Sequence, residues 1–384
     1  MSSGAAENTK LTVNLLDRER FQPFIATLPG QTMEAELAPD VIRLPLRYLR
    51  RSVGPVWDLL ALAELYGAIR QYRFDIVHTH NAKDGILGRW AARFAKTPGI
   101  VHTIHNVSFH ASTSAFLNRQ YAVQERWAAR FTDRLLAVSE TNTAKYLARK
   151  IGRPEQYQTV YSGLEFQRYA DEGLSPSELR TTLGLPDVPG PWVGWIGRFN
   201  PQKDPLTFVR AADLVRRSIP SVEFVVCGDD PLRLSLLREV HSIANAAGLR
   251  EKIHFLGFRR DIGTVLRGID VLMHSSRYEG MGRVVCEALA CGRPVAATAV
   301  DGVTEVIDSG RRGGILSPAG DPVGLAQATL RLLADTSLAR ALADSGRQWV
   351  IAKLSADRMV RAIEQVYFEV LATKNQPNGA VAGA

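Results

Sequence analysis

The chain has 384 residues, of which 46% are hydrophobic and 22% charged, and this composition is ordinary for a globular protein. Its length accommodates two domains of ordinary size, and no uninterrupted apolar stretch is long enough to span a bilayer. The net charge of +8 favours an anionic partner, such as a phosphate-bearing substrate or an anionic membrane surface. The sequence carries no zinc-finger, basic-zipper or aromatic RNA-binding signature, so nucleic acid is not expected as that partner.

The cysteines bear on the compartment and on metal binding. Cys227, Cys286 and Cys291 stand in apolar surroundings without the spacing of metal ligands. Because an odd and sparse set does not build a disulfide framework, it favours a reducing compartment, and we expect a cytoplasmic protein. No Asp-x-Asp motif is present, and we expect no bound metal and no other cofactor.

The first residues form a small-residue loop over Ser2–Ala6, followed by a predicted helix over Glu7–Leu16. A loop of this kind usually follows a strand in a doubly wound fold, and none precedes it in the sequence. We therefore expect the first strand of the N-terminal domain to be missing. Our hypothesis is that translation begins at an earlier codon, which would supply an apolar strand ahead of Ser2.

A basic segment precedes the first long predicted helix, which begins at about Pro55. The helix is predicted from apolar residues at helical spacing, namely Val56, Leu59, Leu60, Ala63, Tyr66 and Ile69. The basic segment combines Arg43, Arg47, Arg50 and Arg51 with Leu46, Tyr48 and Leu49. Such a mixture could dock on an anionic membrane surface. A solvated charge cluster beside a core helix is an equally good interpretation.

Two predicted strands, Phe74–His78 and Ile100–Ile104, are followed by polar loops, and histidines lie at these strand ends and in the loops. These histidines are His78 and His80 at the first strand, and His105 and His110 after the second. Ligands of open α/β sheets bind beyond the carboxyl ends of the strands, so the loops are candidate binding segments.

Within these loops His105 is the strongest candidate, because it is the first residue after its strand. Lys83 and Asn106 are weaker candidates on the acceptor side. His102 falls inside the strand, and we interpret it as structural.

The second half restarts with an apolar strand, Trp192–Ile196, after a polar segment over Glu165–Pro191 that we interpret as an interdomain linker. The following loop, Gly197–Asp204, contains Arg198 and Lys203 directly before a predicted helix. An arginine fork and a lysine point charge at a helix start are typical of an anion clamp.

The most informative stretch is Ser275–Val300, which reads as a loop, a helix and a strand. Glu279 lies in the loop and Glu287 about one turn into the helix. Between them, the backbone N–H groups of Gly280, Met281, Gly282 and Arg283 are candidate phosphate donors at a helix N-terminus. The pattern predicts a nucleotide-sugar site, in which Glu279 holds a sugar hydroxyl and Glu287 the ribose hydroxyls. The alternative interpretation is that Glu279 and Glu287 are two unrelated surface glutamates.

Both halves alternate strands and helices, which predicts two doubly wound α/β domains that face a cleft. We expect an N-terminal domain over residues 1–165 and a C-terminal domain over residues 166–355. A helix over 356–372 follows, and residues 373–384 read as a disordered tail.

With these residues in view, the chain resembles the retaining GT-B glycosyltransferases of family four, over nearly its whole length. The resemblance is carried by Gly197, Arg198, Lys203 and Asp204; by Gly228 and Asp229; by Glu279 and Glu287; by Asp301, Gly302 and Glu305; and by the segments HTHNAKDGILGRWAAR and IVHTIHN. Residues 4–7, GAAE, look like the family's Gly-Gly-Ala-Glu loop, with only Gly4 of its two glycines present. Arg283 stands where the family often has an apolar residue.

The resemblance implies a role for each matched position. Arg198 and Lys203 would hold the diphosphate, Glu279 the donor sugar and Glu287 the ribose. His105 would contact the donor sugar near the reacting carbon, and Phe258 and Arg259 would lie near the base. The final helix would cross back onto the N-terminal domain.

The activity that the resemblance implies is transfer of a sugar, with retention, from a UDP- or GDP-linked donor to a glycan or lipid-linked acceptor. Two other functions stay open on sequence grounds. One is a nucleotide-sugar epimerase or hydrolase of similar fold, and the other is a non-catalytic subunit that binds a nucleotide or a partner enzyme. A protein at the cytoplasmic face of the cell membrane would fit the basic first half.

Overall fold

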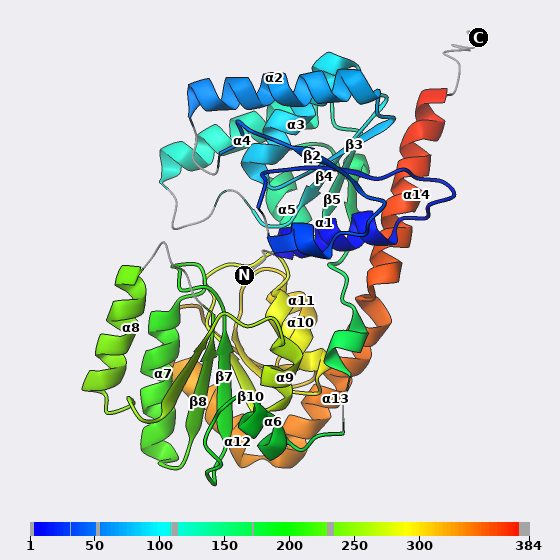
Figure 1. Ribbon diagram of the computed structural model, residues 1–384. Coiled ribbons are helices and arrows are strands. Elements are labelled where there is room, and N and C mark those ends of the chain that lie inside the picture. Colours follow the sequence, from blue (N-terminus) through cyan, green and yellow to red (C-terminus); the bar gives the residue numbers. More distant parts are fainter. Residues whose placement is uncertain are drawn as a thin grey trace, which may run out of the picture. The chain divides into compact units, whose positions relative to one another are not determined.

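The computed structural model describes residues 4–30, 32–50, 54–107, 109, 114–170, 173–228 and 234–375. The chain divides into two compact units (Figure 1). The C-terminal unit comprises residues 164–355, and the N-terminal unit comprises the residues up to 163 together with those from 356 onward. The predicted boundary, between residues 165 and 166, falls two residues after the observed one.

The C-terminal unit is built on a six-stranded parallel sheet. Its strands are short apolar runs, and β7, β8, β10 and β11 are buried along their whole length, as expected for a sheet covered on both faces. The strands are β7 (Trp192–Ile196), β8 (Glu223–Cys227), β9 (Ile253–Gly257), β10 (Val271–His274), β11 (Val295–Thr298) and β12 (Gly314–Ser317).

The order of these strands across the sheet is β12-β11-β10-β7-β8-β9. From β7 the chain proceeds through β8 to the β9 edge, then returns to place β10 on the other side of β7. The β7/β10 pair is therefore the topological switch point, where the connections leaving the two strands run to opposite sides. In open α/β sheets this is where a ligand crevice forms at the carboxyl ends of the strands.

Helices cover both faces of this sheet (Figure 1). Alternate residues of the strands, such as Trp195 and Phe224, pack with α7, α8 and α12 in the main core. Helix α10 contacts β10 and β11 and adjoins α9 and α13. The helices are α6 (Pro176–Thr182), α7 (Pro205–Ser218), α8 (Leu234–Ala246), α9 (Ile262–Arg267), α10 (Arg283–Ala290), α11 (Val303–Val306), α12 (Pro322–Ala334) and α13 (Thr336–Lys353).

The segment predicted as a linker is part of the C-terminal unit. It holds the 3₁₀ helix η3 (Phe166–Tyr169) as well as α6. Tyr169 is buried, and α6 and η3 contact α9. The interpretation as a free interdomain linker was wrong because apolar residues spaced through this polar segment pack onto the domain.

The N-terminal unit contains two parallel sheets. One has four strands in the order β3-β4-β5-β6, and the other pairs β1 with β2. The strands are β1 (Phe24–Thr27), β2 (Ile42–Pro45), β3 (Ile76–His80), β4 (Gly99–Ile104), β5 (Arg134–Ala137) and β6 (Tyr157–Thr159). The cleft predicted between the two units stays a prediction.

Helices complete this unit, and the sequence placed two of their starts too late. Among the described residues α1 (Gly4–Leu15) is the first element, so no strand precedes it there, as expected. However, Gly4 to Ala6 are helical, where the sequence predicted a loop. The other elements are η1 (Thr32–Glu36), α2 (Pro55–Tyr72), α3 (Ala82–Ala95), α4 (Ala115–Ala129), α5 (Glu140–Ala148), η2 (Pro154–Gln156) and α14 (Ala356–Asn375).

Strand β3 ends two residues later than predicted, so His78 and His80 are strand residues, and α3 already begins at Ala82. Lys83 is therefore in the first turn of a helix, where the sequence predicted a loop. The register of β3 against β4 explains the shift, because His78 and His80 lie opposite Val101 and Thr103 within the paired region.

Helix α14 belongs to the N-terminal unit and packs against α1 through the apolar cluster that contains Leu11, Ile363 and Val366. The helix continues to Asn375, so the first residues of the predicted tail are helical. Residues 376–384 lie outside the described part of the chain.

Helix α2 was predicted correctly, but its apolar stripe does not face the core. Of the six residues that predicted the helix, only Ile69 is buried. The buried side of α2 is instead marked by Ala61 and Ile69, which join clusters with residues of α3. In the basic segment before α2, Leu46 and Leu49 are buried and Tyr48 is exposed.

A buried ion pair links α3 to α4. Arg89 and Glu125 are both completely buried, and Arg89 Nη2 lies 2.7 Å from Glu125 Oε2. Arg89 Nε also donates to the Gly85 carbonyl oxygen. Removing one partner of such a pair leaves an uncompensated charge in the core, which is more costly than removing both.

We predict that Glu125→Leu lowers the free energy of unfolding by about 3–5 kcal/mol. The double variant Arg89→Met, Glu125→Leu should recover much of that loss, because no buried charge is left. Urea unfolding of the two variants and the wild type measures the difference. A single variant as stable as the wild type would contradict the assignment.

Candidate functional site

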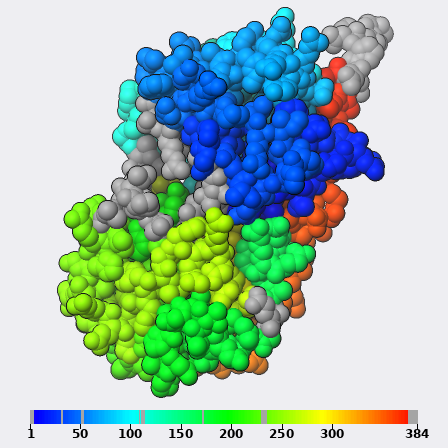
Figure 2. All heavy atoms as spheres, viewed as in Figure 1, coloured from blue at the N-terminus to red at the C-terminus, as the bar shows by residue number. Residues whose placement is uncertain are grey.

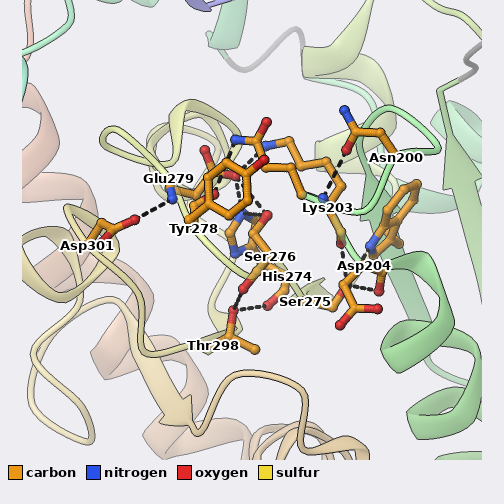
Figure 3. A network of polar contacts seen from close by, with 12 residues as sticks. Asn200, Lys203, Asp204, His274, Ser275, Ser276, Tyr278, Glu279, Thr298 and Asp301 are labelled. Atoms are coloured by element: carbon orange, nitrogen blue, oxygen red, sulfur yellow. Dashed lines mark hydrogen bonds and ion pairs between the residues drawn. The ribbon is translucent and has the colours of Figure 1, made fainter. Parts of the chain in front are cut away.

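Two loops meet at the switch point of the C-terminal sheet (Figure 3). Residues 197–204 follow β7, and residues 275–282 follow β10. Hydrogen bonds join them, among them those from Arg277 N to Gln202 O (2.8 Å), from Gln202 Nε2 to Tyr278 O (3.1 Å) and from Ser275 Oγ to Lys203 O (2.9 Å). The two loops that the sequence singled out therefore form one structure.

The centre of this structure is an ion pair between the Lys203 ammonium and the Glu279 carboxylate. The same carboxylate oxygen, Glu279 Oε1, lies 2.7 Å from Ser276 Oγ and 3.2 Å from His274 Nε2. All three polar partners of the Glu279 carboxylate come from the two loops or the end of β10. The carboxylate is thus held in one orientation before any ligand binds.

This network determines the charge state of both Glu279 and His274. Burial by itself raises the pKa of the Glu279 carboxyl, but the nearby Lys203 and His274 outweigh it and leave the pKa well below its usual range. Burial lowers the pKa of His274, and its hydrogen bond with Glu279 only partly opposes that effect. Near neutral pH Glu279 is therefore a carboxylate and His274 a neutral imidazole.

The Nδ1 atom of His274 is buried without a hydrogen-bond partner among the described residues. The neutral ring consequently carries its proton on Nε2, where it donates to Glu279 Oε1. His274 thus acts on the carboxylate through a single, oriented hydrogen bond.

The turn after Glu279 presents a helix N-terminus. Gly282 is the N-cap of α10 with a φ of 75°, and no side chain caps the helix there. A Cβ at this position would lie 2.8 Å from Val303 Cγ2, so the turn requires glycine for both its φ and its close packing. Asp301 Oδ2 accepts a hydrogen bond from Glu279 N (2.7 Å), which ties the turn to the loop after β11. A helix N-terminus of this kind favours an anion through its backbone N–H groups and its dipole.

Arg198 lies in the same loop as Lys203, is half-buried and forms no ion pair among the described residues. Its neighbour Gly197 is in close backbone contact with Gly228, whose Cβ would lie 1.9 Å from Gly197 O. Glycine at 228 is therefore a packing requirement of the loop that carries Arg198. Asp229, the next residue of that motif, lies outside the described residues.

Glu287 is held from two sides. Arg283 Nε donates to Glu287 Oε1 at 2.9 Å, and the Tyr169 hydroxyl donates to the same oxygen at 2.9 Å. Both bonds fix the carboxylate one turn into α10, beside the turn at 280–282. Arg283, predicted as a phosphate-side donor, thus engages a carboxylate with its side chain.

Phe258 and Arg259 follow β9, two strands away from β7 at the same edge of the sheet. Phe258 is exposed, and Arg259 forms two hydrogen bonds with Asp261 (2.9 and 2.6 Å). They lie in the unit that contains Lys203 and Glu279, in line with a position near a bound base, which stays a prediction.

The N-terminal unit contains its own histidine cluster. His80 Nδ1 and His105 Nε2 are 2.9 Å apart, and their rings stack with centroids 5.1 Å apart. The His78 ring is tilted against that of His80, with centroids 4.4 Å apart, and His78 forms hydrogen bonds with Thr103 and with Tyr367 of α14. A small pocket next to the His80–His105 pair is also lined by Asn8, Thr12 and Met359. His105 thus lines a small pocket that has both polar and apolar walls.

Three weaker candidates are placed differently from each other. Gly4 is exposed at the start of α1, and a Cβ there would meet nothing, so no close approach requires glycine. Lys83 forms an ion pair with Asp58 (2.6 Å) and donates to Arg50 O (2.7 Å). Asn106 Oδ1 accepts from the next backbone amide, Val107 N (2.8 Å), which is the geometry of a local turn.

Sequence reasoning missed several residues that shape the site. His274 and Ser276 were available as polar residues at the end of an apolar strand, a signal that was not used. Tyr169 carried no signal, because it is 118 residues from Glu287 in sequence. Asp301 was noted only for its motif, whereas the structure shows it holding the Glu279 backbone.

Among the described residues, no three His, Cys, Asp or Glu side chains are grouped to hold a metal ion.

The fold and the site together define the class of protein: a glycosyltransferase of the GT-B fold. Two family models match the chain, one described as Glycosyltransferase Family 4 over residues 3–168 and one as Glycosyl transferases group 1 over residues 190–335. The chain belongs to glycosyltransferase family 4.

Relatives of known activity match along most of the chain. A D-inositol 3-phosphate glycosyltransferase of Salinispora arenicola is 30% identical, with 88% of this chain and 81% of that protein aligned. The UDP-Gal:alpha-D-GlcNAc-diphosphoundecaprenol alpha-1,3-galactosyltransferase of Escherichia coli is 27% identical, over 97% of this chain and 95% of that protein. Both relatives are glycosyltransferases, and this chain is one as well.

Among solved structures, Anabaena HepE in complex with UDP-glucose superposes with a TM-score of 0.83 at 21% identity, covering 96% of this chain and 97% of that one. At this identity the similarity shows a shared fold. It confirms the predicted GT-B architecture.

The histidine cluster predicts how stability depends on pH. Burial lowers the pKa of His80 from 6.5 to about 4, and burial also lowers the pKa of His78 and His105. Unfolded histidines titrate near pH 6.5, so below that pH the unfolded chain binds more protons than the folded one. Stability should therefore fall as the pH is lowered from about 6.5 to about 4.

Urea midpoints measured between about pH 7 and about pH 4.5 test this expectation. His80→Gln should flatten the dependence relative to the wild type, since one titrating group is removed. A wild type and a variant with the same slope across this range would contradict the lowered pKa of His80.

Proposed function

We propose that the protein is a retaining, metal-independent glycosyltransferase that moves a sugar from a nucleoside-diphosphate-sugar to a glycan or lipid-linked acceptor. The observation that carries the proposal is the Lys203–Glu279 ion pair at the switch point, beside the N-terminus of α10, where the N-cap residue Gly282 supplies no side-chain cap. A cation, a fixed carboxylate and a helix N-terminus at one point suit a ligand with both phosphates and sugar hydroxyls.

In this proposal the ligand's diphosphate lies between Lys203, Arg198 and the amides at 280–283. Arg198 forms no ion pair among the described residues, and the Lys203 ammonium is a point charge held at the site by Glu279. Glu279 accepts hydrogen bonds from the donor sugar. Glu287, oriented by Tyr169 and Arg283, accepts them from the ribose.

Glycosyl transfer from such a donor requires stabilisation of the negative charge on the leaving diphosphate. When the bond between the sugar's anomeric carbon and the phosphate oxygen breaks, the electron pair stays on the diphosphate, whose charge increases. Preorganised cations and amides at that oxygen typically contribute a few kcal/mol each to the transition state. The two basic side chains and the α10 amides supply this stabilisation without a metal in our proposal.

Retention is proposed to arise by attack from the same face that the diphosphate leaves. The acceptor oxygen bonds to the anomeric carbon, and its proton moves to the departing phosphate oxygen. Glu279 is poorly suited as a nucleophile, because its carboxylate is paired with Lys203 and bonded to Ser276 and His274. His105 is proposed to contact the donor sugar near the reacting carbon.

The substrates and the location are also part of the proposal. HepE is described in complex with UDP and UDP-glucose, and the Escherichia coli relative is named for a UDP-galactose donor and a lipid-diphosphate acceptor. Our proposal is a UDP- or GDP-linked donor and a glycan or lipid-linked acceptor, and these names support UDP and a lipid-linked acceptor. We place the protein in the cytoplasm, at the inner face of the cell membrane. Cys227, Cys286 and Cys291 form no disulfide among the described residues, which supports a reducing compartment. Among the described residues, no helix combines the length and apolarity needed to cross a bilayer.

Lys203→Ala should lower kcat/KM for transfer by about a hundredfold or more, because one charged donor to the leaving group is lost. Arg198→Ala should act in the same direction. Radiolabelled transfer from UDP- and GDP-sugars to a lipid-diphosphate acceptor measures the rate. Arg340→Ala, an exposed arginine on α13, is the matched control and should retain wild-type activity.

The same assay, run with excess EDTA, tests metal independence: the rate should not change. A folded Lys203→Ala enzyme with full activity would contradict the diphosphate clamp, and loss of activity in EDTA would contradict the metal-free mechanism alone.

Donor binding can be measured separately from turnover. UDP or GDP, whichever is the donor nucleotide, should raise the melting temperature, since a ligand that binds only the folded state stabilises it by RT ln(1 + [L]/Kd). ADP should be the weaker ligand. Glu287→Gln should reduce the shift, because it removes the charge that receives the ribose hydroxyls. No shift with any of the three nucleotides would overturn the assigned site.

A further inference from the structure

Helix α2 exposes an apolar stripe on the side that faces away from the core. Val56 and Leu59 are 69% and 67% exposed, and Leu60 and Tyr66 are 38% and 40% exposed. Ala63, also exposed, lies among them on the helical wheel, opposite the buried Ala61 and Ile69. A surface helix normally turns its polar face outward, so an outward apolar stripe indicates a partner surface. We call Val56, Leu59, Leu60, Ala63 and Tyr66 the α2 face.

The excess positive charge of the chain is concentrated around this helix. Residues 43–130 contain thirteen Lys and Arg against five Asp and Glu, an excess of eight that equals the net charge of the entire chain. The rest of the chain is balanced. Arg43, Arg47 and Arg50 lie exposed in the segment that leads into α2.

Exposed apolar side chains are concentrated in the same region. Of the nineteen large hydrophobic side chains that are exposed among the described residues, fifteen belong to the N-terminal unit. Twelve of these lie between Tyr48 and Trp127. In Figure 2 the light-blue atoms of α2 lie at the surface of that unit.

The two acidic side chains of α2 do not offset this charge at the surface. Asp58 is paired with Lys83 (2.6 Å), and Glu64 accepts hydrogen bonds from the backbone amides of Arg47 (2.9 Å) and Tyr48 (3.2 Å). The α2 face is therefore apolar along its length and bordered by unopposed arginines.

Aromatic rings stand between the arginines and the α2 face. Trp57 is 45% exposed, and the Arg50 guanidinium lies over its ring, 5.0 Å from the centroid. The Tyr48 ring stacks with the Trp57 ring, with centroids 6.4 Å apart. Rings with a polar edge and long basic side chains are the groups that suit the headgroup zone of a bilayer.

We propose that the α2 face docks on an anionic lipid bilayer, with α2 lying in the plane of the interface. The apolar stripe would enter the boundary between headgroups and acyl chains, and Arg43, Arg47 and Arg50 would lie at the level of the lipid phosphates. A second copy of this chain is the less suitable occupant, since it would bring the same excess of arginines against this face. The surface is separate from Lys203 and Glu279, so its failure would leave the glycosyl-transfer proposal intact.

Sedimentation of the full chain with vesicles tests the docking surface. The wild type should bind vesicles of phosphatidylcholine with about one third phosphatidylglycerol, and bind pure phosphatidylcholine much less. Replacing Arg47 or Arg50 by Gln should lower the partition coefficient by about fivefold each. Val56→Gln with Leu59→Gln should lower it by at least about tenfold, since two exposed apolar side chains no longer enter the lipid.

The C-terminal unit offers a matched control. Val323 follows the proline that opens α12, as Val56 follows the one that opens α2, and it is 52% exposed. Ile351 on α13 is 48% exposed and matches Leu59. Val323→Gln with Ile351→Gln should bind vesicles as the wild type does. Both double variants should keep the wild-type melting temperature and the wild-type rate on a water-soluble acceptor analogue.

Three outcomes would overturn the proposal. The first is a wild type that does not bind the anionic vesicles, and the second is equal loss of binding in the two double variants. The third is a wild type that is dimeric without lipid and becomes monomeric on Val56→Gln, Leu59→Gln, while vesicle binding is unchanged. That result would assign the α2 face to contact between copies.

Discussion

The ion pair between Lys203 and Glu279 connects the two halves of the C-terminal sheet at the topological switch point between β7 and β10. It joins the loop after β7 to the loop after β10, strands that are neighbours only because the chain returns to the centre of the sheet. The backbone of each residue is also anchored. Lys203 is bonded to Asn200 in its own loop and to Ser275 in the loop after β10, and Glu279 is bonded to Asp301 in the loop after β11. The strand order thus brings the two loops together, and the conformation of the loops holds the two charged side chains against each other.

This arrangement explains why so much of the site is buried. Asp204, Ser275, Ser276 and Glu279 are all buried, although they are polar, and nearly all their hydrogen-bonding atoms have partners within the loops. A buried polar network is stabilising only when it is satisfied, and a satisfied one holds a single geometry. The protein therefore presents a preformed carboxylate and ammonium to its ligand, without reorganisation at the moment of binding.

The N-terminal unit has a different character. Its histidines are also partnered, but with each other, with Thr103 and with Tyr367 from the far end of the chain. Its surface carries the charge excess and most of the exposed large apolar side chains, of which only four among the described residues belong to the C-terminal unit. One unit holds the proposed donor-binding chemistry, and the other carries the surface features that we associate with a membrane.

Short stretches of the sequence were enough to predict the order of the elements and several site residues. Alternating apolar runs and amphipathic segments determined the order of strands and helices, and the position of polar residues directly after buried strands determined Arg198, Lys203 and Glu279 as candidates. Such signals are readable because each depends on residues a few positions apart.

Tertiary structure alone decided the rest. Lys203 and Glu279 are 76 residues apart, and Tyr169 and Glu287 are 118 apart, so their pairing depends on strand order and on a segment that read as a linker. The orientation of α2 was decided in the same way. Its periodicity predicts a helix with an apolar stripe, but only the packing of Ala61 and Ile69 onto α3 shows that the stripe faces outward. Periodicity records that a side is apolar, and it does not record which neighbour, protein or solvent, will cover that side.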